Sequence, residues 1–420
     1  VLCRLQVVPM SLSKQLRRVP MWILVYLLMF LSLPSYAGFA SGSTYPPLSQ
    51  LQAATGTAKD ITQLIVKLRP GMRMLVADDK AAATSAVINT TGLQATYGRS
   101  MSGNAHVLKL PQAISNTEAW AYAKKVATSP EVEYALPDLQ VYPLVENIPN
   151  DPFYTQYQWH YASPSSYAGA ANLPLAWGET TGLPSITVAV VDTGLLNHAD
   201  LKDRLVGGSA SASGYDFISN SSVAKDGDGR DANPSDPGDS ATGQSSWHGT
   251  HVAGTIGAKT NNGLGVAGVD WNAKLLGVRI LGVGANGGTV SFSDLIDGIR
   301  WAAGIDVPGV PTNTNPARVI NMSLGGSGTS CANYPAMQEA IDSVVAKGTT
   351  VVVAAGNEAQ DATNVIPASC NNVVTIAATD LNGALASFSN FGAKVDLTAP
   401  GVDIASTVNA GTTAPAADAY

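Results

Sequence analysis

Charged residues, cysteines and long apolar runs are all scarce in this chain. Only 13% of its 420 residues are charged, and the formal net charge is -7. Because no cluster of lysine and arginine could follow a phosphate backbone, the composition gives no electrostatic case for a nucleic-acid partner. Glycine is abundant, and the overall composition is that of a globular protein. The chain is long enough for two or three domains.

The longest apolar run, residues 21–33, is too short to span a bilayer comfortably. It follows basic residues at 14–18 and precedes small residues around Ala37. This order is typical of a cleaved export signal. We therefore expect residues 1–38 to be a signal peptide and the mature protein to be secreted, extracellular and without a stable membrane anchor. An uncleaved anchor is the alternative.

The chain contains three cysteines, and one of them, Cys3, lies at or before the signal. In an exported protein the other two, Cys331 and Cys370, are expected to form a disulfide. Closing the loop of about 40 residues between them would stabilise the fold by roughly 4 kcal/mol in the chain-entropy account. Two separate buried thiols are the alternative.

Two regions follow the signal before the main domain begins. Residues 39–57 form a polar linker of Ser, Thr, Gln and Ala. Residues 58–146 then alternate strand and helix patterns in the order β-α-β-β-α-β, which predicts a small α+β ferredoxin-like unit. The strand patterns lie at 61–68, 93–97, 106–110, 132–135 and 141–144, and the helical patterns at 78–89 and 117–127.

The large domain, residues 147–420, alternates continuous apolar strands with helices. Such strands predict an α/β fold with a buried parallel sheet and helices on both faces. In these sheets functional residues gather at the carboxyl ends of the strands. Strands are expected at 186–191, 275–280, 319–321, 350–354 and 373–377, and helices at 248–258, 291–303 and 334–347.

Three short segments carry residues suited to nucleophilic catalysis. Asp192 ends an apolar strand run, where a carboxylate can orient an imidazole. His248 opens a helix of small residues and can act as a general base. Asn357 follows the strand at 350–354 and could donate to an oxyanion. Taken singly, Asp192 is an ordinary strand end and Asn357 an ordinary turn residue, so the His248 segment carries most of the signal.

Two metal sites are also possible. His251 lies three residues after His248, and two histidines on one helical face can bind a metal. No glutamate lies between them, so the zinc-protease arrangement is not met. An acidic, Gly-rich loop offers a calcium site, since hard cations prefer carboxylate oxygens; a solvated acidic loop is the alternative. Its candidate ligands are Asp226, Asp228, Asp231, Asp236 and Asp239.

Together these segments resemble the subtilisin-like serine proteases, or subtilases. The resemblance covers about residues 151–420, and the region 150–161 looks most like extracellular subtilases of Gram-negative bacteria. The family order of Asp, then His, then Ser fits what is present. The segments that carry the resemblance are 190–194, 248–255, 319–326, 355–358 and Ala399-Pro400-Gly401.

The resemblance implies a secreted serine endopeptidase, made as a self-processing zymogen, that hydrolyses protein and peptide substrates as a monomer. Asp192 would fix the tautomer of His248, His248 would take the proton from the serine, and Asn357 would bind the oxyanion. Gly287 and Gly288 would form an edge that pairs with an extended peptide. The substrate pocket would be lined by Ser323, Leu324, Gly325, Gly326, Ala354, Ala355 and Gly356.

The same resemblance implies a calcium cofactor and an inhibitor. Residues 58–146 would be an inhibitor-like propeptide that occupies the cleft until it is cut between 144 and 150. An unrelated small domain is the alternative for that region. Calcium would be bound by Asp151, Asp200 and Asn262, with the carbonyl groups of Thr260, Leu264 and Val266.

The nucleophile that the family requires is not found. A subtilase carries its serine in a Gly-Thr-Ser-Met-type segment after Ala399-Pro400-Gly401, and no such segment occurs up to Tyr420. Ser406 lies too near Gly401 and lacks the flanking residues, and Ser323 belongs to the pocket wall. We therefore expect the catalytic domain to be incomplete, truncated before its serine, and the 420-residue chain to be inactive. A non-catalytic, peptide-binding subtilase relative is the alternative function.

Overall fold

The structure, a computed structural model, describes residues 59–69, 79–139, 146–284 and 289–420. The chain divides between Leu144 and Val145 into a smaller and a larger unit. The expected signal peptide and linker lie outside the described residues. No helix in the described part of the chain has the length and apolar character needed to cross a membrane.

The smaller unit is a four-stranded antiparallel sheet with two helices. Its sheet order is β2-β3-β1-β4, the order of a ferredoxin-like unit. The strand expected at 141–144 lies outside the described residues. Its elements are β1 Lys59–Leu68, α3 Asp79–Thr91, β2 Thr96–Ser100, η3 Ser102–Asn104, β3 Ala105–Ser115, α4 Asn116–Val126 and β4 Val132–Pro137.

Both helices of the smaller unit cover one face of its sheet. Leu64, Val66 and Leu108 from the strands pack against the buried faces of α3 and α4. The start of α4 is fixed by a capping box, in which the Ser115 side chain accepts from the Glu118 N–H and the Glu118 side chain accepts from the Ser115 N–H. This unit therefore has its own hydrophobic core.

The larger unit is built on seven parallel strands in the order β13-β12-β10-β8-β5-β7-β6. The sheet confirms the predicted α/β fold, and each of the five strands expected from the sequence is present. The strands are β5 Thr187–Asp192, β6 Gly214–Asp216, β7 Lys274–Arg279, β8 Val319–Met322, β10 Thr350–Ala354, β12 Val374–Thr379 and β13 Leu397–Pro400.

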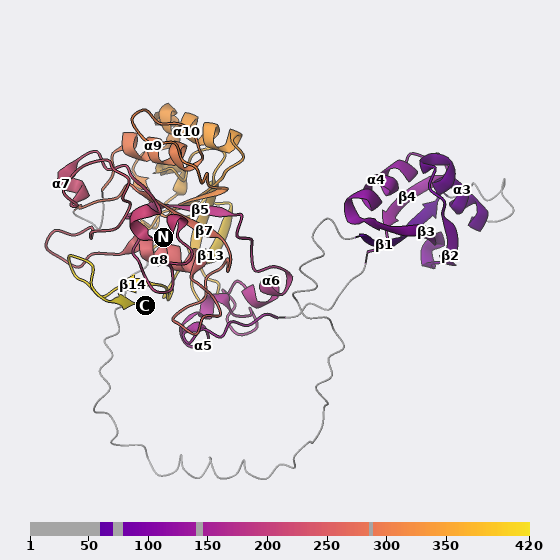
Figure 1. Cartoon of the computed structure of the whole chain (residues 1–420), viewed down its shortest axis with the longest axis horizontal. Helices are drawn as coiled ribbons and strands as arrows, with labels where there is room; N and C mark the ends of the chain where they lie inside the picture. The colour runs from indigo at the N-terminus through magenta and orange to yellow at the C-terminus, as the bar shows by residue number, and fades with distance from the viewer. Residues whose placement is uncertain (1–58, 70–78, 140–145, 285–288) are drawn as a thin grey trace, which may run out of the picture. The chain divides into compact units, whose positions relative to one another are not determined.

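Helices cover both faces of this sheet, as predicted (Figure 1). Ala189 and Val191 of β5 belong to the core beneath α9 (Phe292–Ala302) and α10 (Pro335–Ala346). The intervening Val190 belongs to a second core with α8 (His248–Gly257). Because successive side chains of a strand point to opposite faces, α8 lies on the other side of the sheet.

The sequence patterns do not predict β6 and β13, the two edge strands. β6 has only three residues, and β13 ends in Pro400, which a strand tolerates at an edge. Two further small sheets form between β9 Gly326–Ser327 and β11 Val365–Ile366, and between β14 Val408–Asn409 and β15 Asp418–Ala419. Short helical segments are α5 Tyr154–Tyr157, η4 Trp159–Tyr161, α6 Leu173–Glu179, η5 Val206–Gly208, η6 Ala210–Ala212, α7 Ser221–Ala224, η7 Cys331–Asn333 and η8 Ala362–Asn364.

The predicted disulfide between Cys331 and Cys370 is confirmed. Their Cα atoms lie 4.9 Å apart, and both residues are buried. Each cysteine closely follows one strand of the β9–β11 pair, in which Gly326 pairs with Ile366. The disulfide therefore joins the two segments that this small sheet already brings together.

Replacing both cysteines in the double variant Cys331→Ala, Cys370→Ala should lower the free energy of unfolding of the larger unit by up to about 4 kcal/mol. The reason is that the unfolded chain regains the entropy that a closed loop of 39 residues removes. Urea unfolding measures the change. Since residues 59–139 contain no cysteine, an equal loss in the smaller unit would contradict this account.

Candidate active site

Asp192 and His248 meet at the carboxyl edge of the large sheet. The Nδ1 atom of His248 lies 2.8 Å and 2.9 Å from the two carboxylate oxygens of Asp192. Asp192 is completely buried, and His248 is 7% exposed. A carboxylate on Nδ1 leaves Nε2 as the basic nitrogen of the neutral ring. The structure thus brings together the predicted orienter and the predicted base.

The position of Asp192 is fixed by the strand that it ends. Its carbonyl oxygen accepts from the N–H groups of Ile280 and Leu281, which follow β7. Its carboxylate also accepts from the Thr193 N–H at 2.8 Å. Backbone bonds therefore fix the main chain of Asp192, and the Thr193 N–H helps to hold its carboxylate, which faces His248.

The helix that carries His248 begins at a strained residue. Trp247, at the N-cap of α8, has a φ of 51°, a left-handed conformation that is uncommon for a bulky side chain. Its buried indole donates to the carbonyl oxygen of Gly411 at 2.9 Å. We infer that this bond and the surrounding packing hold the turn that places His248 over Asp192.

Two glycines of the His248 segment are required by the close approach of neighbouring atoms. A Cβ atom on Gly249 would lie 2.2 Å from the Gly194 carbonyl oxygen. A Cβ atom on Gly254 would lie 2.2 Å from Thr407 Oγ1. The small residues of this segment therefore let α8 lie directly against the Asp192 strand end and against the segment around Thr407.

Ser406 is a structural residue of that neighbouring segment. Its hydroxyl donates to the carbonyl oxygen of His251 at 2.7 Å, and the side chain is buried. The Thr407 hydroxyl donates to the Thr250 carbonyl oxygen at 2.8 Å. These bonds agree with the expectation that Ser406 is not the nucleophile.

His248 and His251 have different partners. His251 Nε2 lies 3.0 Å from the Ile404 carbonyl oxygen, whereas His248 Nδ1 faces Asp192. Burial lowers the pKa of His251 to about 4, so its ring is neutral above that pH. In the described part of the chain no three His, Cys, Asp or Glu residues form a group that could hold a metal. The geometry therefore gives the two-histidine metal site no support.

Asn357 lies in the turn after β10, at the same edge of the sheet as Asp192. Strands β5, β8 and β10 are consecutive neighbours, so the strands that lead to the two residues are two strand spacings, about 10 Å, apart. The turn is held by the buried Asn390, which donates to Ala355 O at 2.9 Å and accepts from the Glu358 N–H at 3.0 Å. At Gly356, φ is 107° and a Cβ would lie 2.2 Å from Asn390.

The residues expected to line the substrate pocket leave the sheet side by side. Residues 323–326 follow β8 and residues 354–356 end or follow β10, and these strands are parallel neighbours. The Ser323 hydroxyl accepts from the side-chain amide of Asn321 at 2.9 Å. Gly287 and Gly288 lie outside the described residues, so the expected peptide-binding edge stays a prediction.

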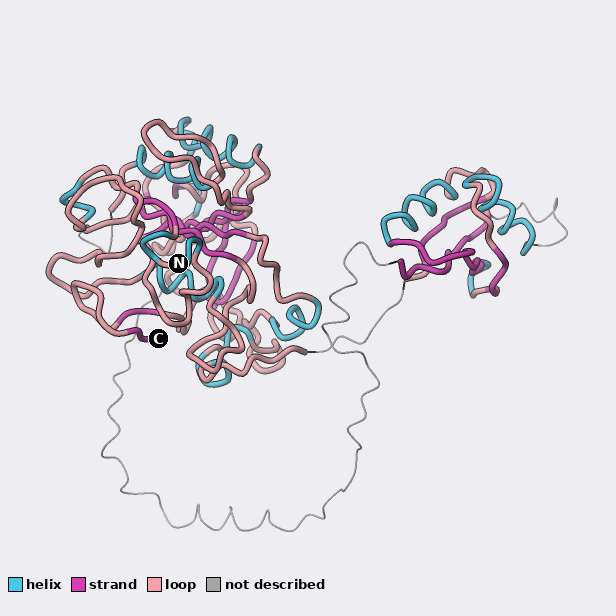
Figure 2. The backbone as a smooth tube through the Cα atoms, viewed as in Figure 1, coloured by secondary structure: helices cyan, strands magenta, loops and turns pink. Residues whose placement is uncertain are grey.

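The acidic loop does not gather its carboxylates into a metal site. Residues 225–247 run as loop (Figure 2). Asp226 forms an ion pair with Arg279, and Asp231 accepts from the Asn233 N–H within the loop. Asp236 and Asp239 face hydrogen-bond donors of neighbouring segments. Composition predicted a calcium site here, but the geometry gives it no support.

Asp151 and Asp200 form a buried acidic pair that fits a cation. Asp151 accepts from the N–H groups of Asn261 and Asn262, and Asp200 accepts from the Asn262 side-chain amide and the Val266 N–H. Burial raises the pKa of Asp200 to about 6, and the charge of Asp151 adds to that shift. Two desolvated carboxylates beside an oxygen-rich loop have the chemistry that calcium prefers.

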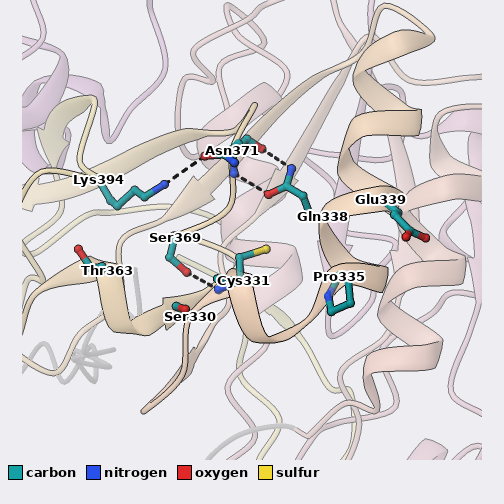
Figure 3. A pocket seen from close by; sticks show the side chains of 10 residues that line it. Ser330, Cys331, Pro335, Gln338, Glu339, Thr363, Ser369, Asn371 and Lys394 are labelled. Atoms are coloured by element: carbon teal, nitrogen blue, oxygen red, sulfur yellow. Dashed lines mark hydrogen bonds between the residues drawn. The ribbon is translucent and has the colours of Figure 1, made fainter.

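A separate surface pocket of about 430 Å³ lies beside the disulfide (Figure 3). Its wall includes Ser330, Gln338 and Lys394, and Lys394 Nζ donates to Asn371 Oδ1 at 3.3 Å. Gly328, Thr329 and Ser330 have the same order as the Gly-Thr-Ser of the family's nucleophile segment. Ser330, however, belongs to the wall of this separate pocket. Asp192, His248 and Asn357 do not line the pocket, so it is distinct from the candidate active site.

Comparison with known proteins agrees with this geometry. The profile of the subtilase family (Peptidase_S8) matches residues 184–420. An extracellular protease of Xanthomonas campestris pv. campestris is 40% identical over 382 residues, which are 87% of this chain and 62% of the relative. An extracellular basic protease of Dichelobacter nodosus is 42% identical over 347 residues, which are 79% of this chain and 54% of the relative.

A solved protease structure from Pseudoalteromonas arctica is also similar. It shares 46% sequence identity, with a TM-score of 0.59 over 65% of this chain and 81% of that chain. The chain therefore belongs to the subtilase family, which confirms the family predicted from its motifs. The chain spans 62% and 54% of the lengths of the first two relatives.

Sequence reasoning missed several residues that support the site. Trp247 and Asn390 carry no motif signal, because their roles depend on contacts with segments far along the chain. The sequence shows Thr193 only as part of the Asp192 segment. In the structure its hydroxyl accepts from the Gly249 N–H at 3.0 Å. A polar residue directly after a catalytic strand end is the one signal that could have pointed to Thr193.

Gly249→Ala should lower the free energy of unfolding by about 1–3 kcal/mol, because the new Cβ forces α8 away from Gly194. Urea unfolding measures the loss. Gly257→Ala in the same helix is the matched control, since its Cβ would meet other atoms only at 3.5 Å or more. That control should be neutral or slightly stabilising. Equal destabilisation by both variants would contradict the close approach at Gly249.

Acid should weaken the larger unit through its buried histidines. His160 is 3% exposed, and neither ring nitrogen has a hydrogen-bond partner in the described residues. Burial lowers its pKa from 6.5 to about 3. Between those values the unfolded chain binds the proton and the folded chain does not. The free energy of unfolding therefore falls as pH falls, by at most about 1.4 kcal/mol per pH unit from this residue.

Replacing this ring with an apolar one tests the effect. His160→Phe should flatten the loss of unfolding free energy between pH 6.5 and pH 3.5, as measured by urea unfolding at several pH values. The parent chain measured at the same pH values is the control. An unchanged slope in the variant would show that His160 does not contribute.

Proposed function

We propose that this protein is a secreted serine endopeptidase of the subtilase type. The observation that carries the proposal is the buried Asp192–His248 pair, with His248 Nδ1 at 2.8 Å from the carboxylate. The pair lies at the carboxyl edge of the sheet in a chain that belongs to the subtilase family. Two relatives are named extracellular proteases, which supports secretion and protein substrates.

The residues present can perform the base and oxyanion steps of peptide hydrolysis. His248 Nε2 would take the proton of a serine hydroxyl as its oxygen bonds to the scissile carbonyl carbon. Asp192 would stabilise the imidazolium that forms, and the Asn357 amide would donate to the carbonyl oxygen as it becomes negative. His248 would then give the proton to the departing amine as the peptide C–N bond breaks.

The serine itself is not among these 420 residues in the form that the family uses. No Gly-Thr-Ser-Met segment occurs in the chain, and the hydroxyl groups of Ser323 and Ser406 are hydrogen-bonded to Asn321 and to His251. We therefore propose that a polypeptide of these residues alone does not catalyse serine-dependent proteolysis. Residues 323–326 and 354–356 supply the walls of the substrate pocket in this proposal.

The smaller unit fits the role of an inhibitory propeptide. It precedes the catalytic unit, has its own core and has a ferredoxin-like strand order. Tyr134, Leu136 and Leu139 near its end are exposed apolar side chains of the kind that bind another surface. We propose that the zymogen is cut between residues 144 and 150, which releases the catalytic unit.

Calcium is the proposed cofactor. The carboxylates of Asp151 and Asp200, the side chain of Asn262 and the carbonyl groups of Thr260, Leu264 and Val266 would hold it. Calcium would supply charge that neutralises two buried carboxylates and stabilises the loop at 260–266. The support is the burial of Asp151 and Asp200, because loss of water around the two carboxylates raises the pKa of each.

Protein expressed from its complete coding sequence should hydrolyse casein and react with a fluorophosphonate probe. His248→Ala should lower kcat by about 10⁶-fold, because the serine loses its base. The polypeptide of residues 1–420 should remain unlabelled. Casein binding without hydrolysis by the complete protein would instead identify a non-catalytic, peptide-binding relative, and labelling of the 420-residue polypeptide would contradict the proposed absence of a nucleophile.

Calcium at 100 times its Kd should raise the free energy of unfolding of the larger unit by about 2.7 kcal/mol over EDTA. Asp200→Asn should remove most of this gain, because it deletes a charged ligand. Asp203→Asn is the control, since Asp203 is exposed and pairs with Lys259. Thermal unfolding with and without calcium measures both variants, and a full calcium response in Asp200→Asn would rule out this site.

A further inference from the structure

The acidic loop contains two buried carboxylates that the proposed reaction does not use. Asp236 and Asp239 are each 1% exposed, and they lie three residues apart. A buried carboxylate is costly unless hydrogen bonds satisfy its oxygens. The groups that donate hydrogen bonds to these two carboxylates show which segments the loop contacts.

Asp236 holds the segment that carries Asp192. Its Oδ2 accepts from the Thr193 hydroxyl at 2.7 Å, and its Oδ1 accepts from the Gly238 N–H at 2.8 Å. The Thr193 hydroxyl in turn accepts from the Gly249 N–H at 3.0 Å. One hydroxyl therefore connects the residue after Asp192 with the residue after His248.

Asp239 holds the other segment, which carries His248. Its Oδ1 accepts from the Ser246 N–H at 2.7 Å, and its Oδ2 accepts from the Ser246 hydroxyl at 2.5 Å. The Ser246 hydroxyl accepts from the His248 N–H at 3.2 Å. The backbone of His248 is thus connected to the loop through a single serine.

The loop also packs closely against the strand end. The Leu195 N–H donates to Pro234 O, and the Asp236 N–H donates to Leu195 O, each at 3.1 Å. A Cβ on Gly194 would lie 2.6 Å from Pro234 O. Movement of the loop would therefore move the backbone on both sides of the Asp192–His248 bond.

We propose that Asp236 and Asp239 are positioning residues, which hold Asp192 and His248 in hydrogen-bonding register through Thr193 and Ser246. This proposal rests on the proposed function, because it concerns the same pair. In this proposal the acidic loop, for which composition alone predicted a metal site, maintains the geometry of the Asp192–His248 pair. Each of the two carboxylates accepts a hydrogen bond on both of its oxygens.

The test measures the Asp192–His248 bond directly in folded chain with ¹⁵N-labelled histidine. The chemical shift of the His248 Nδ1 proton reports that bond only in molecules that are folded. Thr193→Val removes the hydroxyl at nearly constant volume, and Asp239→Asn removes one acceptor of Ser246. Both should move the signal upfield or abolish it, with at least about tenfold faster exchange of the proton, the effect of losing one hydrogen bond.

Two variants serve as controls. Thr193→Ser keeps the hydroxyl and should keep the signal. Asp306→Asn removes a carboxylate that also accepts from a threonine hydroxyl, Thr312 Oγ1 at 2.9 Å, but on the exposed surface. It should leave the shift unchanged and the exchange rate within about twofold, since no hydrogen bond to the site is lost.

An unchanged His248 signal in both Thr193→Val and Asp239→Asn would overturn the proposal and leave these residues a structural role only. Urea midpoints measured in parallel show whether either variant is merely less stable. A parent chain without the signal would overturn the positioning role and the Asp192–His248 pair together. A parent with the signal but no proteolysis from the complete coding sequence would overturn only the proposed function.

Discussion

The hydrogen bond between Asp192 and His248 is the interaction on which the rest of the site depends. It joins a fully buried carboxylate at the end of β5 to an imidazole at the start of α8. A buried carboxylate is stable only when its oxygens are satisfied, and here the partners are the imidazole and the Thr193 N–H. The sheet fixes one partner and a helix on its face fixes the other, so their relative position is a property of the fold.

This contact explains much of the local sequence. A helix that begins over a strand end needs a residue without a side chain where the backbones meet, and Gly249 is that residue. Gly254 leaves room for the hydroxyl groups of Ser406 and Thr407. The strained Trp247 conformation sets the angle at which α8 starts. The Asn357 turn depends in the same way on Gly356 and the buried Asn390. Several residues of the motifs are therefore needed for packing, and only a minority of the motif residues are candidates for the chemistry.

The long apolar strands and the helices at 248–257, 292–302 and 335–346 could be predicted from periodicity, because their patterns extend over several turns or pleats. The edge strands β6 and β13 could not, because they are short and their pairing depends on neighbours. The pairing of Asp192 with His248 was expected from the resemblance to the subtilases. The calcium site expected in the acidic loop stays a prediction, since composition shows where carboxylates are but not which groups face them. Asp236 and Asp239 face donors.

We propose that Asp192 acts by holding His248 in the tautomer and orientation of a base. The most direct test is the steady-state kinetics of Asp192→Asn in protein expressed from the complete coding sequence. We expect a fall in kcat of about 10⁴-fold with little change in KM, because the substituted amide can donate to Nδ1 and favours the wrong tautomer. A fall in kcat of less than about tenfold, the value of one ordinary hydrogen bond, would contradict it.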